Sequence, residues 1–410
     1  MSGLSLSPGA AEVIRRLERA GFEAYAVGGC VRDSLMGRLP HDFDVAASAT
    51  PDEVIAIFSQ KAKIITTGLK HGTVTLIINE EQIEITTFRT ESAYSDFRRP
   101  DRVEFSNKID EDLSRRDFTI NAMAWSPLRG LADPFGGAGD LSDGIIRAVG
   151  DPAERFSEDP LRILRALRFA SKLGFGIEPT TGGAMRAQAG LLGKIAGERV
   201  YAELRGIFAG KAAGQVLSCY LDVIDVIIPG SSEISGLPER LTRKKFCDDD
   251  EPWIQGLAVL LAGRGSKPGL AAKLGLAALD RLGGRLKLDK YTHDMLCFLI
   301  ANQRRTTPPD DKYILRRLSQ WGEKKLAALL TLRDDERTLA GMVRLIGSGA
   351  CYSLAQLEVS GGDLIELGLS PGEGVGRALR GLLRGVTDGQ LSNDRDSLLH
   401  AAGKYIANPK

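Results

Sequence analysis

Residues 25–45 constrain the fold of this chain more than any other stretch. A short apolar run ends in Gly28-Gly29, a segment long enough for a helix follows, and a second short run carries Asp42 and Asp44 two residues apart. Because successive side chains of a β-strand point to opposite faces, the two aspartates share one face of the predicted strand. Two carboxylates on one face can hold a pair of divalent cations about 3.5–4 Å apart, which is the arrangement of two-metal phosphoryl transfer.

The residues before this pair predict a phosphate site. Gly28-Gly29 allows backbone N–H groups to approach a phosphate closely, and Arg32 adds a fork of donors for phosphate oxygens. The alternative for Asp42 and Asp44 is an ordinary strand edge with two solvated carboxylates. Because the Gly-Gly-x-x-Arg-Asp sequence precedes them, we favour a site that holds a triphosphate and two metal ions.

The N-terminal part of the chain predicts an α+β domain. Apolar residues at helical spacing predict a helix over residues 8–20. Thr50-Pro51-Asp52-Glu53 has an N-cap, a first-turn proline and a capping-box glutamate, so it predicts the start of a second helix. Three β-rich runs between residues 63 and 90 and the two strands within residues 25–45 then predict a mixed five-stranded sheet with helices.

The second half of this domain adds further candidates. Glu84 is a charged residue within an apolar β-run, and is either a third carboxylate beside Asp42 and Asp44 or an exposed edge-strand glutamate. Residues 90–112 are polar and long for a connection without secondary structure, which is typical of functional or mobile loops. Arg115-Arg116 precedes an apolar run, and this order suits a phosphate-facing turn that enters a buried helix.

Residues 157–170 predict a helix with a charged flank. Asp159, Arg162 and Arg165 recur every three residues and share that flank, whereas Arg168 has rotated half-way round the helix. A solvated helix face with ion pairs is the simplest interpretation.

The chemistry of this flank offers a second interpretation. The carboxylate of Asp159 only accepts hydrogen bonds and the guanidinium of Arg162 only donates them. Cytosine and adenine present an amino donor beside a ring-nitrogen acceptor, whereas uracil and guanine present a carbonyl acceptor beside an N–H donor. The pair therefore complements CTP and ATP and would leave polar groups unpaired against UTP and GTP, which is how large discrimination arises.

The rest of the chain is helical in pattern, and composition limits its functions. A chain of 410 residues needs two or three domains, and its net charge of +1 confines nucleic-acid contacts to local patches. The basic clusters around Arg240 and Arg304 are either such patches or ordinary solvated helix faces. Five scattered cysteines predict a reducing compartment without disulfides or structural zinc. No secretory signal is expected, and every apolar run falls short of a membrane span.

Together these motifs resemble those of the class II tRNA nucleotidyltransferases (CCA-adding enzymes) and of the closely related bacterial poly(A) polymerases. The resemblance covers residues 20–205. It is carried by seven motifs in order: Gly28-Gly29-x-x-Arg32-Asp33, Asp42-x-Asp44, Gly72-Thr73-Val74, Glu84-Ile85-Thr86-Thr87-Phe88-Arg89, Arg115-Arg116-Asp117-Phe118-Thr119-Ile120-Asn121-Ala122, Glu158-Asp159-x-x-Arg162-x-x-Arg165 and Glu198-Arg199-Val200.

The resemblance implies an architecture for the whole chain. A polymerase-β-type nucleotidyltransferase head would occupy residues 1–150, and an all-α neck, body and tail would follow. The neck, residues 151–215, would recognise the nucleotide base. The body and tail, residues 216–410, would bind tRNA.

It also implies roles for named residues. Asp42 and Asp44 would hold Mg²⁺, with Glu84 or Asp117 as a candidate third carboxylate. The nucleotide would contact a further set of residues: Gly29, Arg32 and Arg116, then Asp159 and Arg162 at the base, and Arg165 and Arg168 at the sugar or phosphates. The implied reaction adds C, C and A from CTP and ATP to the 3′ end of tRNA, without a template and with release of pyrophosphate.

Related activities remain alternatives at this stage. A poly(A) polymerase shares the head, and some relatives add only CC or only A. The loop around residues 96–101 resembles the flexible loop of enzymes that complete all three additions, so it favours the full activity. We expect a cytoplasmic enzyme without membrane attachment, and the sequence predicts no oligomeric state.

Overall fold

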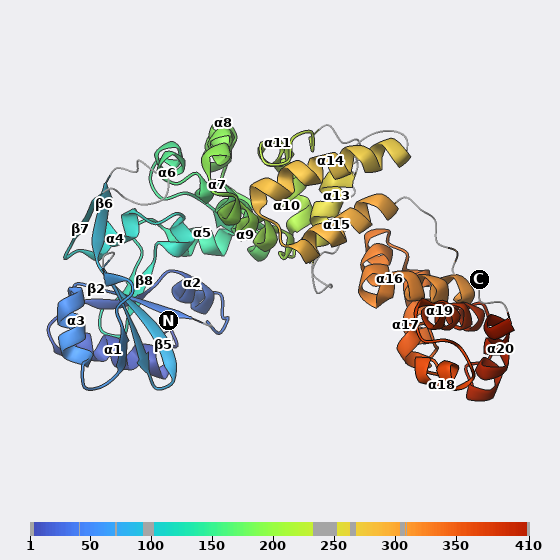
Figure 1. The fold of residues 1–410 in the computed structure, drawn as a ribbon. Helices are drawn as coiled ribbons and strands as arrows, with labels where there is room; N and C mark the ends of the chain where they lie inside the picture. The colour runs from blue at the N-terminus through green and yellow to red at the C-terminus, as the bar shows by residue number, and fades with distance from the viewer. Residues whose placement is uncertain are drawn as a thin grey trace. The chain divides into compact units, whose positions relative to one another are not determined.

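A computed structural model describes residues 4–40, 42–69, 72–92, 102–232, 252–262, 268–303, 308 and 310–407. The chain forms two compact units, one of residues 1–256 and 284–287 and the other of residues 257–283 and 288–410 (Figure 1). The predicted boundaries at residues 150 and 215 both fall inside the first unit, so the division into head, neck, and body with tail stays a prediction. The loop at residues 96–101 and the basic clusters around Arg240 and Arg304 lie outside the described residues.

The first unit contains a mixed seven-stranded sheet in the order β3-β4-β5-β2-β1-β8-β9. Strands β2 and β5 run parallel, and the other neighbours are antiparallel. The strands are β1 (Ala24–Val27), β2 (Phe43–Ala47), β3 (Lys63–Ile65), β4 (Thr73–Ile78), β5 (Glu81–Thr87), β8 (Ala124–Ser126) and β9 (Gly130–Ala132).

The predicted α+β class is confirmed, but the predicted number of five strands is wrong. The two additional strands, β8 and β9, have three residues each and are too short to show a period of two. The buried helix predicted after Arg115-Arg116 is also wrong. A single 3₁₀ turn (Thr119–Asn121) leads directly into β8, because a short apolar run fits a buried strand as well as a helix. Residues 90–112 contain a β-ribbon, β6 (Arg89–Ser92) with β7 (Arg102–Phe105), and the helix α4 (Ile109–Ser114).

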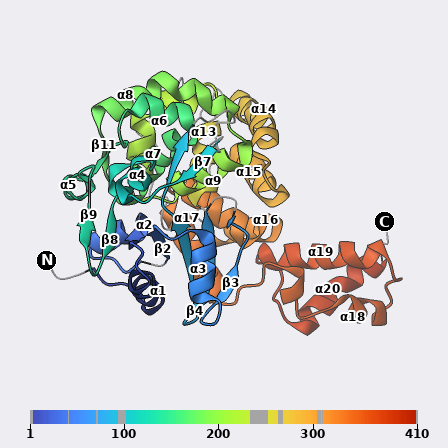
Figure 2. The same ribbon diagram turned by 90° about the vertical axis from the view of Figure 1, so that its left-hand side faces the viewer.

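Two helices with well-formed caps cover one face of this sheet. Helix α1 (Pro8–Arg19) begins after Ser7, whose hydroxyl accepts the N–H of Ala10. Helix α3 (Pro51–Phe58) begins with the predicted capping box of Thr50 and Glu53. It lies against β4 (Figure 2).

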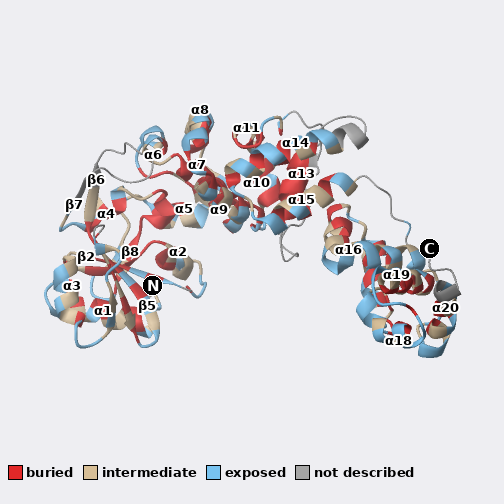
Figure 3. Cartoon of the chain, in the orientation of Figure 1, coloured by how far each residue is buried: buried red, intermediate tan, exposed pale blue. Residues whose placement is uncertain are grey.

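The sheet separates two apolar cores, visible as buried segments in Figure 3. Phe43, Val45 and Ile85 pack with α1 and α3. On the opposite face, Ala46 packs in a second core that includes Leu113 of α4. Because side chains alternate along a strand, the exposed Asp44 points to this opposite face, as predicted.

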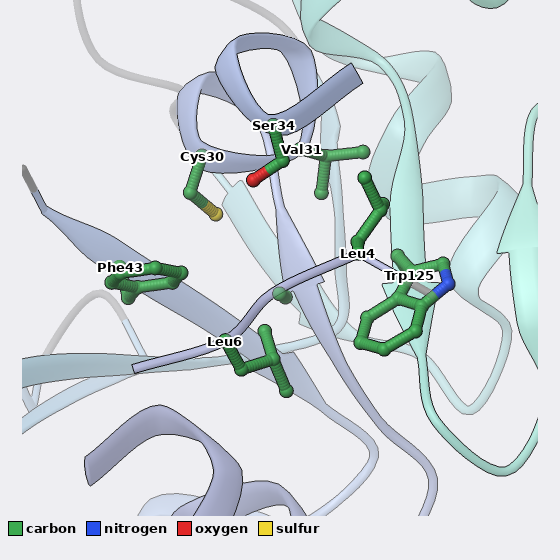
Figure 4. Close-up of a pocket in the computed structure, with 8 residues that line it drawn as sticks. Leu4, Leu6, Cys30, Val31, Ser34, Phe43 and Trp125 are labelled. Carbon is green, nitrogen blue, oxygen red and sulfur yellow. The ribbon is translucent and has the colours of Figure 1, made fainter. Parts of the chain in front are cut away.

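The N-terminal segment fixes the helix that follows the Gly-Gly turn. Leu4 and Leu6 lie beneath α2 (Gly29–Leu35) and close a small apolar pocket (Figure 4). Cys30 contributes to the same pocket from α2, and no space for a water molecule remains inside. This packing anchors α2 to the sheet, and thereby the turn from which α2 begins.

Helices make up most of the remaining described chain. In the first unit they are α5 (Gly137–Asp143), α6 (Pro152–Glu158), α7 (Leu161–Leu173), α8 (Pro179–Gln188), α9 (Gly197–Phe208), α10 (Ala213–Cys219) and α11 (Leu221–Asp225), with a small parallel pair of strands, β10 (Ile145–Ile146) and β11 (Gly176–Ile177). Helices α13 (Pro252–Ala262) and α14 (Pro268–Leu286) have residues in both units. The second unit continues with α15 (Lys290–Asn302), α16 (Asp311–Leu332), α17 (Glu336–Gly347), α18 (Gly361–Glu366), α19 (Glu373–Thr387) and α20 (Arg395–Ala407). None of the helices in the described ranges combines the length and apolar character needed to cross a membrane.

Candidate active site

The two aspartates lie at the start of β2, in the middle of the sheet. Asp42 precedes the strand and Asp44 is its second residue, and both are exposed. The register pairs Asp44 with Val27 at the end of β1 and with Glu84 on β5. The Gly-Gly turn therefore begins directly beside Asp44, and two strands bring the predicted phosphate and metal groups together.

The carboxylates of Glu84 and Asp42 act electrostatically on Asp44. Although its side chain reaches solvent, the surrounding protein atoms raise the pKa of Asp44 above its ordinary value, and the charges of Glu84 and Asp42 raise it further. Arg116 acts in the opposite direction. A cation bound at these carboxylates would relieve this repulsion.

The two candidates for a third carboxylate have different surroundings. Glu84 is the neighbour of Asp44 in the parallel ladder. Asp117 is instead buried and accepts hydrogen bonds from Nε and Nη2 of Arg165 at 2.8 and 2.5 Å and from Nδ2 of Asn121 at 3.1 Å. Among the described residues, no three His, Cys, Asp or Glu side chains converge as a metal-binding group, and the choice between Glu84 and Asp117 as a third carboxylate stays a prediction.

Two arginines adjoin the Gly-Gly turn. Gly28 has a φ of +75°, which favours glycine, and a Cβ on it would lie 2.9 Å from Nη1 of Arg116, so a larger residue would displace the end of that side chain. Arg32 on α2 is buried and donates from Nη1 to Oδ1 of Asn121 at 2.7 Å and from Nε to Asp33 at 2.9 Å. A Cβ on Gly29 would lie 3.6 Å from Nη2 of Arg32. The turn is thus lined by two guanidinium groups.

Asp159 and Arg162 are bound to different partners. Asp159 precedes α7 in an extended conformation, so it is not part of the helical flank that the spacing predicted. Its Oδ1 accepts the N–H of Leu161 at 3.1 Å and its Oδ2 accepts Nη2 of Arg199 at 2.9 Å.

The buried Arg162 donates from Nη1 to Glu158 at 2.8 Å and from Nη2 to the carbonyl of Arg115 at 3.0 Å. This carbonyl connects α7 to the turn that carries Arg116. The structure therefore joins the predicted base-reading and phosphate-binding residues through the backbone.

Phe169, a residue that the sequence did not single out, lies among three of the predicted arginines. The guanidinium carbons of Arg32, Arg165 and Arg168 lie 5.4, 5.4 and 5.1 Å from the centre of its ring. These are cation–π distances, so one buried ring holds arginines from α2 and α7.

Each of these arginines has a carboxylate partner. Arg32 pairs with Asp33, Arg165 with Asp117, and Arg168 with the buried Glu203 of α9 at 2.8 Å. Burial raises the pKa of Glu203, and the nearby arginines oppose this shift. A buried carboxylate facing α7 leaves no periodic signal in the sequence, so Glu203 was missed.

A groove of about 600 Å³ opens beside Asp42. The N-terminal segment and the β4–β5 hairpin form its walls, and Asp42 is one of the residues that line it. The residues that line it are Ser5, Leu6, Ser7, Pro8, Leu39, Pro40, Asp42, Phe43, Glu80, Glu81, Gln82 and Ile83.

Two family descriptions match the chain. Residues 24–147 match the Poly A polymerase head domain, which contains the two aspartates, the Gly-Gly turn and Arg116. Residues 174–219 match the family described as a probable RNA and SrmB-binding site of polymerase A.

Curated relatives match over almost the whole length. The chain is 40% identical to the CCA-adding enzyme of Limosilactobacillus fermentum over 406 residues, which covers 96% of each protein. It is 36% identical to the CCA-adding enzyme of Leuconostoc mesenteroides, over 96% of this chain and 95% of that protein. The fold is similar to the crystal structure of the Bacillus stearothermophilus CCA-adding enzyme in complex with CTP, with a TM-score of 0.76, 29% identity and coverage of 98% and 99% of the two chains.

Proposed function

Because this chain belongs to the CCA-adding enzymes, which are nucleotidyltransferases that add C, C and A to the 3′ end of tRNA, we propose that its Asp42 and Asp44 hold Mg²⁺ for this transfer. The observation that carries the proposal is the placement of Asp44 beside Glu84, Asp42 and the Gly-Gly turn. The alternatives, poly(A), CC-only or A-only addition, use the same chemistry and differ in the product.

The residues at the start of β2 fit a magnesium site. Carboxylate oxygens are ligands that Mg²⁺ prefers, and this ion usually takes one or two carboxylates and completes its shell with waters and substrate phosphates. Two exposed aspartates therefore suffice, and Glu84 adds negative charge. When bound, Mg²⁺ would lower the pKa of the tRNA 3′-hydroxyl and neutralise charge on the triphosphate.

The chain's own residues would bind the triphosphate next to the metal. Arg116 lies over the Gly-Gly turn and its side chain is partly exposed, so its guanidinium is placed to bind a phosphate oxygen. Gly29 allows the phosphate to approach the backbone closely. Arg32 on α2 and Arg165 and Arg168 on α7 surround the ring of Phe169 and would supply further guanidinium donors on this side of the triphosphate.

The base would be read by Asp159 and Arg162. Each now has a partner in the protein, Arg199 for Asp159 and Glu158 for Arg162, and binding of C or A would replace these partners by the base edge. The donor and acceptor pattern of C and A matches one acceptor beside one donor. The crystallised relative with CTP supports the choice of a nucleoside triphosphate as ligand.

We propose that the head, the neck, and the body with the tail have separate tasks in this reaction. The head at residues 1–150 would carry the chemistry, the neck at 151–215 the choice of base, and the body and tail at 216–410 the contacts with tRNA. The described cysteines Cys30, Cys219, Cys297 and Cys351 are all free, which supports a cytoplasmic enzyme.

The test is an addition assay on tRNA that lacks its CCA end. With CTP alone we expect two additions, with ATP alone none, and with both exactly three followed by a stop. A long A tail would identify a poly(A) polymerase, and a stop after CC with both nucleotides a CC-only enzyme. In the same assay Asp42→Ala should abolish every addition, and Asp52→Asn, an exposed change on α3, should leave all three. Addition by Asp42→Ala would refute the metal assignment.

A further inference from the structure

Asp112, on α4, is a buried carboxylate with two arginine partners. Its side chain is 0% exposed. Oδ1 accepts from Nε and Nη2 of Arg115 at 3.0 and 2.7 Å, and Oδ2 accepts from Nη2 of Arg116 at 3.2 Å. Burial opposes ionisation, but the two guanidinium groups hold the pKa of Asp112 below its ordinary value. A permanent negative charge therefore fixes two consecutive arginines.

The contact of Asp112 with Arg116 orients the Arg116 side chain. Its Nη2 is bound to Asp112 and its Nη1 lies 3.5 Å from the carbonyl of Asn121, above Gly28. Its Nε is buried and has no hydrogen-bond partner. A buried donor without a partner is costly in a folded protein, so the contacts with Asp112 and with the carbonyl of Asn121 hold the guanidinium in this orientation. Without Asp112, the long arginine side chain would lose one of these two contacts.

The contact of Asp112 with Arg115 leads to α7, the helix that carries Arg162. Asp112 holds the side chain of Arg115 through two donors that meet one oxygen, Oδ1, and the backbone carbonyl of Arg115 accepts Nη2 of Arg162 at 3.0 Å. Hydrogen bonds between ionised groups are shorter and stronger than those between neutral groups. The position of the Arg115 backbone, and with it one anchor of Arg162, thus depends on the same carboxylate.

We propose that Asp112 is a positioning residue of this enzyme that sets the orientation of Arg116 toward the triphosphate and of Arg162 toward the base. This role rests on the proposed function of those two arginines. Asp112 itself is buried behind them and does not touch the nucleotide. Its effect is on how tightly and how selectively the nucleotide binds, whereas the metal-binding aspartates govern the chemical step.

The experiment uses Asp112→Asn in the full chain, because asparagine keeps the shape and removes the charge. We expect KM for both CTP and ATP to rise about tenfold, as is typical when an outer partner of a binding residue is lost. Incorporation of UTP and GTP relative to CTP and ATP should increase in the same variant. Asp110→Asn is the matched control, since it makes the same change at an exposed position of the same helix. Its KM for CTP and ATP and its selection against UTP and GTP should stay unchanged.

Two further measurements distinguish a positioning role of Asp112 from a merely structural one. Because Asp112 acts partly through Arg116, the rise in KM of Asp112→Asn with Arg116→Lys should be smaller than the product of the rises in the two single variants. If Asp112→Asn does not fold, Arg115→Lys keeps the positive charge but loses one of the two donors that meet Oδ1 of Asp112, and the same loss of base selection is expected from it.

Unchanged KM and unchanged selection in folded Asp112→Asn would overturn this inference, and so would unchanged selection in Arg115→Lys where Asp112→Asn does not fold. Fully additive effects of Asp112→Asn and Arg116→Lys on KM would also overturn it. These failures are distinct from a failure of the proposed roles of the two arginines, which would appear as an unchanged KM in Arg116→Lys alone and unchanged selection in Arg162→Ala alone.

Discussion

The guanidinium of Arg116 lies directly above Gly28, and a Cβ on that glycine would come within 2.9 Å of Nη1. Gly28 also has a φ of +75°, in the left-handed region. Two separate constraints therefore meet at one residue of the Gly-Gly turn: the backbone needs glycine, and the arginine needs the space. They can be measured separately.

Gly28→Ala should combine both effects. The backbone of Gly28, with φ +75° and ψ −126°, lies in a region that costs an L-residue about 1–3 kcal/mol of folding free energy. The displaced Arg116 should raise KM for CTP and ATP about tenfold, since small misplacements in a site have large kinetic effects. Gly37→Ala is the control: Gly37 has a φ of +70° and nothing within 4 Å of its Cβ position. It should lose similar stability in urea unfolding and keep its KM, and an equal rise in both variants would contradict the role of Arg116.

Asp44 should make the metal-free protein less stable at neutral pH. Its pKa is raised in the folded state by the surrounding protein atoms, which displace part of its water, and by the charges of Glu84 and Asp42. A raised carboxyl pKa means that stability is lost as pH rises from the ordinary value of 3.8 through the folded value. Asp44→Asn, which has no charge to repel, should therefore be more stable than the wild type at pH 7 in EDTA, although it should be inactive.

Unfolding measured at several pH values tests whether Asp44 destabilises the metal-free protein. Urea unfolding in EDTA should show the difference between Asp44→Asn and wild type shrinking as pH falls through the raised pKa, and vanishing below 3.8. Added Mg²⁺ should stabilise the wild type and not the variant. A variant that is less stable than wild type at pH 7 in EDTA would contradict the repulsion between the carboxylates.

The parts of the site that sequence alone predicted depend on short-range rules. The alternation of Asp42, Phe43 and Asp44 and the capping box of Thr50 follow from periods and spacings within a few residues. The two missed strands were too short for this reasoning.

The missed contacts join distant positions, and the sequence has no local pattern for them. Arg32 meets Asn121 across 89 residues, and Arg165 meets Asp117 across 48. Asp112 is an intermediate case. It precedes Arg115 and Arg116 by three and four residues, the helical spacing of ion pairs, so its contacts were visible in principle.

Phe169 should matter for nucleotide affinity although it is apolar. Phe169→Leu removes the ring from beneath three guanidinium groups and leaves an aliphatic side chain, so we expect a loss of about 2 kcal/mol in stability and a higher KM for CTP and ATP. Phe118→Leu is the control, because its ring meets Phe169 edge-on at 5.7 Å in the same core. Thermal unfolding should show that both variants are destabilised, whereas KM should rise only in Phe169→Leu. Equal KM values in Phe169→Leu and Phe118→Leu would refute the role of the Phe169 ring.

Selection of C and A should depend on Asp159 and Arg162 together. Asp159→Ala with Arg162→Ala removes the acceptor and the donor that match these bases, so discrimination against UTP and GTP should fall by about a hundredfold or more. Some catalysis should remain, because Asp42 and Asp44 are untouched. Single-nucleotide addition to tRNA lacking CCA, with each of the four triphosphates in turn, measures the ratio.

The partners of these two residues supply the control for this prediction. Glu158→Gln breaks the ion pair of Arg162 without removing either base-reading group, since Glu158 accepts Nη1 of Arg162 at 2.8 Å. If reading the base requires Arg162 to leave Glu158, this variant should bind CTP and ATP at least as tightly as wild type and keep its selection. A loss of selection in Glu158→Gln equal to that of the double variant would mean that the shape of the α6–α7 junction, and not the donor and acceptor pattern, chooses the base.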